Sequence, residues 1–291
     1  MNQKRIFWII LLFLIASLDV SLTRNLEQNH STGRWESQLA DEEEALATIR
    51  AFELPYDVYK KFCGKLKENF KIKNNRELSE SILAYLFCQS LEQSDLEQWR
   101  EQEQEAEPEL YADFTKMVEN LLADAVFFPV PEASDNEEAS VSYENSWQFE
   151  RTYGGVRGHE GCDLMASVQV RGYYPIVSVS DGTVEKMGWL PQGGYRIGIR
   201  SRQGVYYYYA HLAEYEEGIT EGMDITAGQL LGYMGDTGYS EVEGTTGNFP
   251  VHLHFGMYLD VDGKGEVSFN PYYLLGMLEH KKLKYVYRRK G

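Results

Sequence analysis

The sequence is poor in cysteine, with only three such residues: Cys63, Cys88 and Cys162. No CxxC pair occurs, so a zinc site built from thiolates is not supported. Three cysteines cannot all pair within one molecule. Two alternatives stay open: a disulfide between Cys63 and Cys88, the only pair within one predicted domain, or three reduced core residues.

Basic residues are also scarce, with 28 Lys and Arg against 45 Asp and Glu and a formal net charge of -17. This imbalance argues against nucleic acid or an anionic membrane surface as the primary partner. Most of the acid lies in the first half, where solvated helix faces and linkers account for it. The apolar fraction of 43% excludes a disordered chain.

The chain has one long apolar run, Ile6 to Leu18, which follows Lys4 and Arg5. A basic start before an apolar run indicates an export signal. The run is short for a membrane span, which needs about 20 residues. Two outcomes stay open, a cleaved signal peptide within residues 1–20 and an uncleaved membrane anchor through residues 6–20. Both predict that the remainder works outside the cytoplasm, either secreted or anchored to the membrane.

The first half is predicted to be helical. Residues 21–40 are polar and indicate a stalk, and residues 41–128 carry apolar stripes at helical spacing, the strongest beginning after Pro108. We expect a small helical domain that spaces the second half from the membrane, binds a protein partner or covers the active site. Residues 129–145 are acidic and are predicted to form a linker.

From residue 146 the apolar periodicity changes to two, and glycines punctuate the sequence. The pattern predicts hairpins at Asp181-Gly182 and Gln203-Gly204, and further strands over 230–234 and 252–261. A helix is expected over Pro271 to Leu278, followed by an exposed basic tail at 279–291. The predicted fold class is therefore α+β and multidomain, with a small helical domain before a mainly antiparallel β domain at 146–278.

Four of the six histidines lie in three short motifs of this β half. His252 and His254 are two apart, so on a strand they share one face, and Leu253 and Phe255 point to the core. Alone, this HxH pattern equally fits two surface histidines.

His159 and Asp163 are four apart and superficially match a helical HExxH zinc motif. The surrounding glycines make a helix costly. In an extended or turning backbone, His159 and Asp163 share a face and flank Gly161, which has no side chain to block a metal. Glu160 and Cys162 then point away and receive no catalytic role.

His211 ends an aromatic run, Val205 to Ala210. Alternation places His211 on the same face as Tyr207 and Tyr209. These two tyrosines either line a groove or, more conservatively, pack in the core.

Taken together, these motifs resemble the lysostaphin-type zinc metallopeptidases, which cut the peptide part of bacterial peptidoglycan. The resemblance covers about residues 145–275, and it also rests on Gly228-Gln229-Leu230-Leu231-Gly232 and Gly235-Asp236-Thr237-Gly238. It implies one Zn²⁺ per chain, held by His159, Asp163 and His254, with a fourth position open. It also implies that His211 and His252 are catalytic without binding metal.

The resemblance leads to one main hypothesis, a zinc metalloendopeptidase of the bacterial cell envelope whose substrate is a peptidoglycan peptide. The alternative is a catalytically silent envelope protein that binds peptidoglycan or activates another wall hydrolase. A third interpretation, a lipoyl- or biotinyl-carrier-like module, fails because no lysine stands at the expected hairpin turn.

Overall fold

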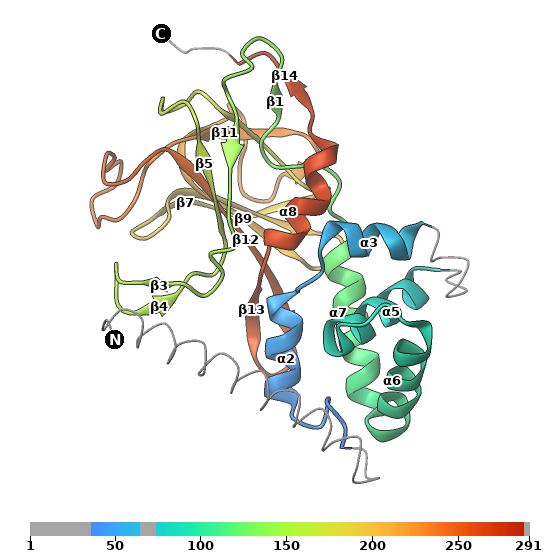
Figure 1. Ribbon diagram of the computed structural model, residues 1–291. Helices are drawn as coiled ribbons and strands as arrows, with labels where there is room; N and C mark the ends of the chain where they lie inside the picture. The colour runs from blue at the N-terminus through green and yellow to red at the C-terminus, as the bar shows by residue number, and fades with distance from the viewer. Residues whose placement is uncertain (1–35, 65–73, 288–291) are drawn as a thin grey trace, which may run out of the picture.

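The computed structural model describes residues 36–64 and 74–287, and it confirms the predicted fold class. A group of N-terminal helices precedes a mainly antiparallel β half, and the two parts lie side by side (Figure 1). The export signal predicted within residues 1–20 lies outside the described residues, as does most of the predicted stalk. Along the described part of the chain, no helix combines the length and apolar character needed to cross a membrane.

Four of the five helices described in the first part begin at a side-chain cap or at a proline, and the helix that begins at Gln93 has neither. The helices are α2 (Glu42–Ala51), α3 (Tyr56–Cys63), α5 (Asn75–Cys88), α6 (Gln93–Ala106) and α7 (Pro108–Ala123). Asp41 caps α2 by accepting hydrogen bonds from the backbone of Glu43 and Glu44. Pro108 opens α7, where a missing N–H costs nothing. Their apolar stripes meet in a core that includes Ile49, Ile82 and Leu121.

The β half is built on a ten-stranded antiparallel sheet with the path β10-β7-β8-β9-β12-β5-β2, where β11 pairs with β6 and β9, and β13 with β12. Its strands are β2 (Val141–Ser142), β5 (Cys162–Ala166), β6 (Pro175–Val177), β7 (Gly182–Leu190), β8 (Gly194–Ser201), β9 (Tyr206–Tyr215), β10 (Asp224–Ile225), β11 (Leu230–Met234), β12 (His252–Val261) and β13 (Gly265–Phe269). A short pair, β3 (Glu150–Arg151) and β4 (Arg157–Gly158), stands beside it. The predicted C-terminal helix is α8 (Tyr272–Leu278), followed by the 3-10 turn η1 (Glu279–Lys281).

Of the two predicted hairpins, one is confirmed. Strands β8 and β9 pair around Gln203-Gly204. The hairpin at Asp181-Gly182 is wrong, because β6 pairs with β11 while β7 pairs with β8 and β10. Alternation finds a strand, but it does not say which strand is its neighbour.

The segments predicted as a linker and as an exposed tail are also corrected. Within 129–145, β1 (Glu132–Ala133) pairs in parallel with β14 (Lys284–Tyr285) of the tail, and β2 pairs with β5. The Tyr287 hydroxyl donates a 2.5 Å hydrogen bond to the carbonyl of Pro131. These segments therefore belong to the folded β half, although their acidic and basic surfaces suggested otherwise.

The end of the predicted stalk is likewise docked on the helices. Leu39 is fully buried, and the backbone N–H of Gln38 donates to the Glu103 carboxylate at 2.8 Å. The Trp99 indole N–H donates to the Gln38 side chain at 2.6 Å. All three cysteines are free thiols, so the structure shows no bond between Cys63 and Cys88.

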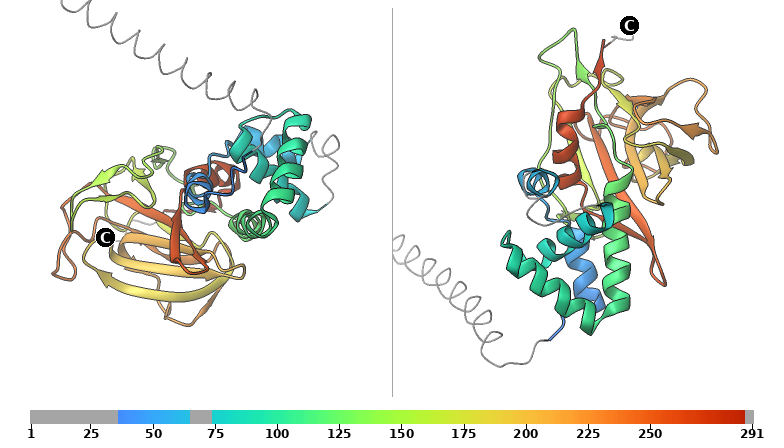
Figure 2. Two further views of the ribbon diagram at one scale, coloured as in Figure 1. Left: turned by 90° about the horizontal axis from the view of Figure 1, so that it is seen from below. Right: turned by 90° about the vertical axis from the view of Figure 1, so that its right-hand side faces the viewer.

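The helices contact the β half through α2 and α3. Arg50 on α2 donates to the Ser268 carbonyl at 2.9 Å and to its hydroxyl at 3.1 Å, and the Asn270 N–H donates to the Arg50 carbonyl at 2.8 Å. Tyr56 on α3 packs against His280 with ring centroids 4.7 Å apart. The left view in Figure 2 shows the helices at one side of the β half, away from the β3–β4 pair.

Candidate metal centre

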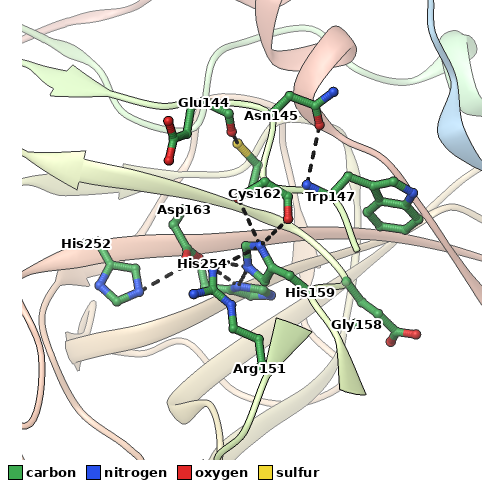
Figure 3. A network of polar contacts seen from close by, with 12 residues as sticks. Glu144, Asn145, Trp147, Arg151, Gly158, His159, Cys162, Asp163, His252 and His254 are labelled. Atoms are coloured by element: carbon green, nitrogen blue, oxygen red, sulfur yellow. Dashed lines mark hydrogen bonds and ion pairs between the residues drawn. The ribbon is translucent and has the colours of Figure 1, made fainter. Parts of the chain in front are cut away.

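Two segments far apart in the sequence, residues 159–163 and the start of β12, bring His159, Asp163 and His254 together (Figure 3). Asp163 on β5 stands directly opposite His254 on β12 in the antiparallel register. His159 precedes β5 on the extended stretch after β4, where its backbone pairs with Phe149. The backbone here is extended or turning, as the glycines predicted, and no helical zinc motif forms.

The three side chains present their ligand atoms as a nearly equilateral triangle. His159 Nε2 lies 3.1 Å from Asp163 Oδ1 and 3.0 Å from His254 Nδ1, and the latter two atoms are 3.0 Å apart. Ligands at about 2.0–2.1 Å from a tetrahedral zinc stand roughly 3.3 Å apart. Small outward shifts therefore suffice to admit the ion, and the donor set of two imidazoles and one carboxylate suits zinc.

Neighbouring groups orient these ligands. His159 Nδ1 lies 3.2 Å from the Ser146 carbonyl and 3.0 Å from the Ser146 hydroxyl, and these contacts orient the ring so that Nε2 faces the cluster. Arg151 donates to the second oxygen of Asp163, Oδ2, at 2.7 Å. Neither Ser146 nor Arg151 could be predicted from the sequence, because neither position carries a spacing signal that links it to the motifs.

Asp163 stays ionised in this setting. Burial acts to raise its pKa, but hydrogen bonds from His159 and His254 outweigh that effect and hold the pKa of Asp163 well below its usual range. A carboxylate held in its charged form beside two imidazole rings is a donor set that suits a divalent cation.

His211 reaches the cluster through an irregularity in β9. Its φ is 63°, in the left-handed region that non-glycine residues rarely occupy. The registers of β9 with β8 and with β11 both shift near this residue. The bulge turns His211 to the opposite face from Tyr207 and Tyr209. The predicted shared face is therefore wrong, and the two tyrosines are fully buried in the core.

His211 and His252 lie beside the cluster, and their rings make the same kind of hydrogen bond. His211 Nδ1 donates to the Thr237 carbonyl at 2.7 Å, and His252 Nδ1 donates to the Pro250 carbonyl at 2.8 Å. The rings lie 4.7 Å apart, and Phe249 packs against both. Burial lowers the pKa of each histidine, so each is neutral with its Nε2 free to accept a proton.

A cleft of about 460 Å³ opens over the histidines and Asp163. Its wall includes Tyr206, Tyr208 and Tyr258, which strict alternation along β9 and β12 places opposite the core residues. The cleft-facing position of these tyrosines is therefore implied by the alternation in the sequence. Tyr239 also lines the cleft and stacks on Tyr153 with ring centroids 4.6 Å apart.

The residues lining this cleft all lie between positions 151 and 266. None of them comes from the described helices of the first part. Of the three roles expected for the helical part, covering the active site therefore has no support in the arrangement observed.

Comparison with known proteins agrees with the fold and the cluster. The model of the family described as "Peptidase family M23" matches residues 157–271. A crystal structure from Ruminococcus gnavus, provisionally assigned as the glycyl-glycine endopeptidase LytM, is 39% identical with a TM-score of 0.67. That alignment covers 83% of this chain and 94% of the other.

Two curated relatives match half of the chain or less. An L-Ala–D-Glu endopeptidase of Bacillus subtilis is 43% identical over 145 residues, which span 50% of this chain and 41% of that protein. Lysostaphin of Staphylococcus simulans is 31% identical over 126 residues, 40% of this chain and 23% of that protein. This chain thus covers less than half of either relative.

The fold, the cluster and the relatives define a peptidase. More narrowly, the chain belongs to peptidase family M23, which confirms the resemblance drawn from its motifs.

Proposed function

We propose that the protein is a zinc-dependent endopeptidase that cuts the peptide part of bacterial peptidoglycan. The observation that carries this proposal is the convergence of three ligand atoms at 3.0–3.1 Å, with two proton-accepting histidines beside them. An arrangement with three protein ligands and adjacent bases is typical of catalytic rather than structural zinc.

His159, Asp163 and His254 would hold the ion. When bound, zinc would supply a Lewis acid that polarises the scissile carbonyl and lowers the pKa of the attacking water. Arg151 holds the second oxygen of Asp163, which keeps the first oxygen directed at the cluster. Because Arg151 occupies one oxygen of Asp163, this carboxylate would bind the ion through its other oxygen alone.

His211 and His252 supply the proton chemistry. Each keeps its Nδ1 proton on a backbone carbonyl, so each presents Nε2 to the cleft. Either one can accept the proton of the attacking water at its free Nε2, and the ring protonated in this way can then donate that proton to the leaving amine. His252 Nε2 lies 3.8 Å from Asp163 Oδ1, which places it at the edge of the ligand set.

The relatives point to a cell-wall substrate and to two kinds of bond. One is named for the bond between L-Ala and D-Glu, and two others are glycyl-glycine endopeptidases by name. Wall substrates lie outside the cytoplasm, which agrees with the export signal expected before residue 20. We place the protein in the extracytoplasmic space on these grounds.

The test uses the full chain and its His159→Ala variant. We expect about one zinc per chain by metal analysis and newly released amino groups from purified peptidoglycan, both abolished in the variant. A zinc-loaded chain that binds the wall without releasing amino groups would contradict the enzyme and favour the catalytically silent binder.

A further inference from the structure

Two arginines face each other beside the catalytic cluster. Arg151 on β3 and Arg157 on β4 are direct partners in the antiparallel register, and both line the cleft. Side chains so paired have Cβ atoms about 4.5–5.5 Å apart, and like charges in this position destabilise the pair. The β3–β4 hairpin therefore bears an electrostatic cost at the mouth of the site.

The two arginines differ in their partners. Arg151 is paired with Asp163 at 2.7 Å. Within the described ranges, no carboxylate lies at ion-pair distance from Arg157, whose one hydrogen bond is a long contact of 3.4 Å to the Gly158 carbonyl. The Nε atom of Arg157 is buried without a partner. A buried N–H donor without an acceptor costs free energy, so a bound ligand that supplies the acceptor would be stabilised.

The surroundings of Arg157 show where a partner would bind. Burial raises the pKa of Tyr208 and of Tyr258, and the positive charge of Arg157 partly opposes the rise in both. Arg157 and these two tyrosines line the same cleft. Arg200, another cation of the lining, is already neutralised by Glu185 and Glu266.

We propose that Arg157 binds a carboxylate that the substrate carries beside the scissile bond. A guanidinium with open donors in a partly dry cleft matches a carboxylate in charge and in geometry. In a chain of net charge -17, an unpaired cation at the active site has little use unless an anion comes from outside.

This inference rests on the proposed function and selects between two kinds of bond. A glycyl-glycine bond offers no side-chain carboxylate. A glutamate residue joined onward through one of its carboxyl groups keeps the other free, next to the bond that joins it to alanine. The substrate class is therefore a peptide with a free acid at the residue following the cut.

The test compares two L-Ala–D-Glu peptides, one with the spare carboxyl group free and one with it converted to the amide. We expect the wild-type chain to favour the free acid in kcat/KM by about 10- to 100-fold, the range for a hydrogen-bonded charge. Arg157→Gln should bring this ratio close to one, and Arg157→Lys should keep part of it. Arg202→Gln, which removes an exposed arginine paired with Asp181 outside the cleft lining, should keep it fully.

Binding gives a second readout that does not need turnover. In the zinc-free chain, calorimetry should show tighter binding of the acid than of the amide, and Arg157→Gln should remove the difference. A wild-type ratio near one, or an equal loss on both peptides in Arg157→Gln, would overturn the subsite. If amino groups are still released from peptidoglycan in that case, the subsite fails while the peptidase stands.

Discussion

A Cβ atom on Gly161 would lie 2.5 Å from Cε1 of His254 and 2.8 Å from the carbonyl oxygen of Phe255. Real Cβ atoms do not approach other atoms so closely. The His254 ring on β12 therefore occupies the space that a side chain at position 161 would need. Glycine at position 161 therefore leaves room for the His254 ring, in addition to its place between His159 and Asp163.

Gly161→Ala should consequently displace His254 and weaken zinc binding. We expect kcat/KM to fall about 100-fold or more, because displacements of about 1 Å at a catalytic site have effects of this size. Zinc titration and turnover on peptidoglycan check this. The matched control is Gly276→Ala on α8, where an added Cβ meets nothing within 4 Å. A Gly161→Ala chain with unchanged zinc affinity would refute the steric argument.

The roles of the histidines can be separated by substitution. His254→Ala should lose both zinc and turnover, since it removes a ligand atom. His211→Asn should retain zinc and lose about 10²- to 10⁴-fold in kcat, the usual contribution of a positioned acid or base. Asparagine is chosen because it tolerates the φ of 63° at this position. Metal analysis beside steady-state kinetics distinguishes the cases, and loss of zinc from His211→Asn would rule out our division between ligands and catalysts.

Much of the centre could be predicted from local pattern. Alternation on β12 correctly separated His252 and His254 from the buried Leu253 and Phe255. Strand period is a local property, so it is visible in sequence. The bulge at His211 is not, because a single residue with positive φ shifts the face of everything after it.

Features that depend on neighbours in space were not predictable. Arg151 and Arg157 are neighbours only because β3 pairs with β4. Strands of two residues are too short to show a periodicity in the sequence. The acidic composition of 129–145 suggested a linker, but backbone hydrogen bonds place β1 and β2 in sheets whatever the charge of their exposed side chains.

The buried carboxylate of Glu103 anchors residues 37–39 to the helices. Glu103 on α6 is fully buried and accepts hydrogen bonds from the Ser37 hydroxyl at 2.5 Å and from the N–H groups of Gln38 and Leu39 at 2.8 and 3.3 Å. In Glu103→Gln an amide N–H₂ faces these donors, so we expect the free energy of unfolding to fall by about 1–3 kcal/mol. Chemical denaturation measures it. Glu105→Gln, exposed on the same helix, should change it little, and equal effects of the two variants would contradict the anchoring role.

Metal-free chain should lose stability in mild acid. Burial lowers the pKa of His211, His252 and His254 below the ordinary value of about 6.5. As the pH falls below about 6.5, the unfolded chain binds protons that the folded chain refuses, so the free energy of unfolding falls with pH. Each histidine contributes at most about 1.4 kcal/mol per pH unit. Denaturation in a chelator between pH 8 and pH 5 should show this slope, and His211→Asn should make it shallower. A flat profile would mean that the folded chain protonates these rings as readily as the unfolded chain does.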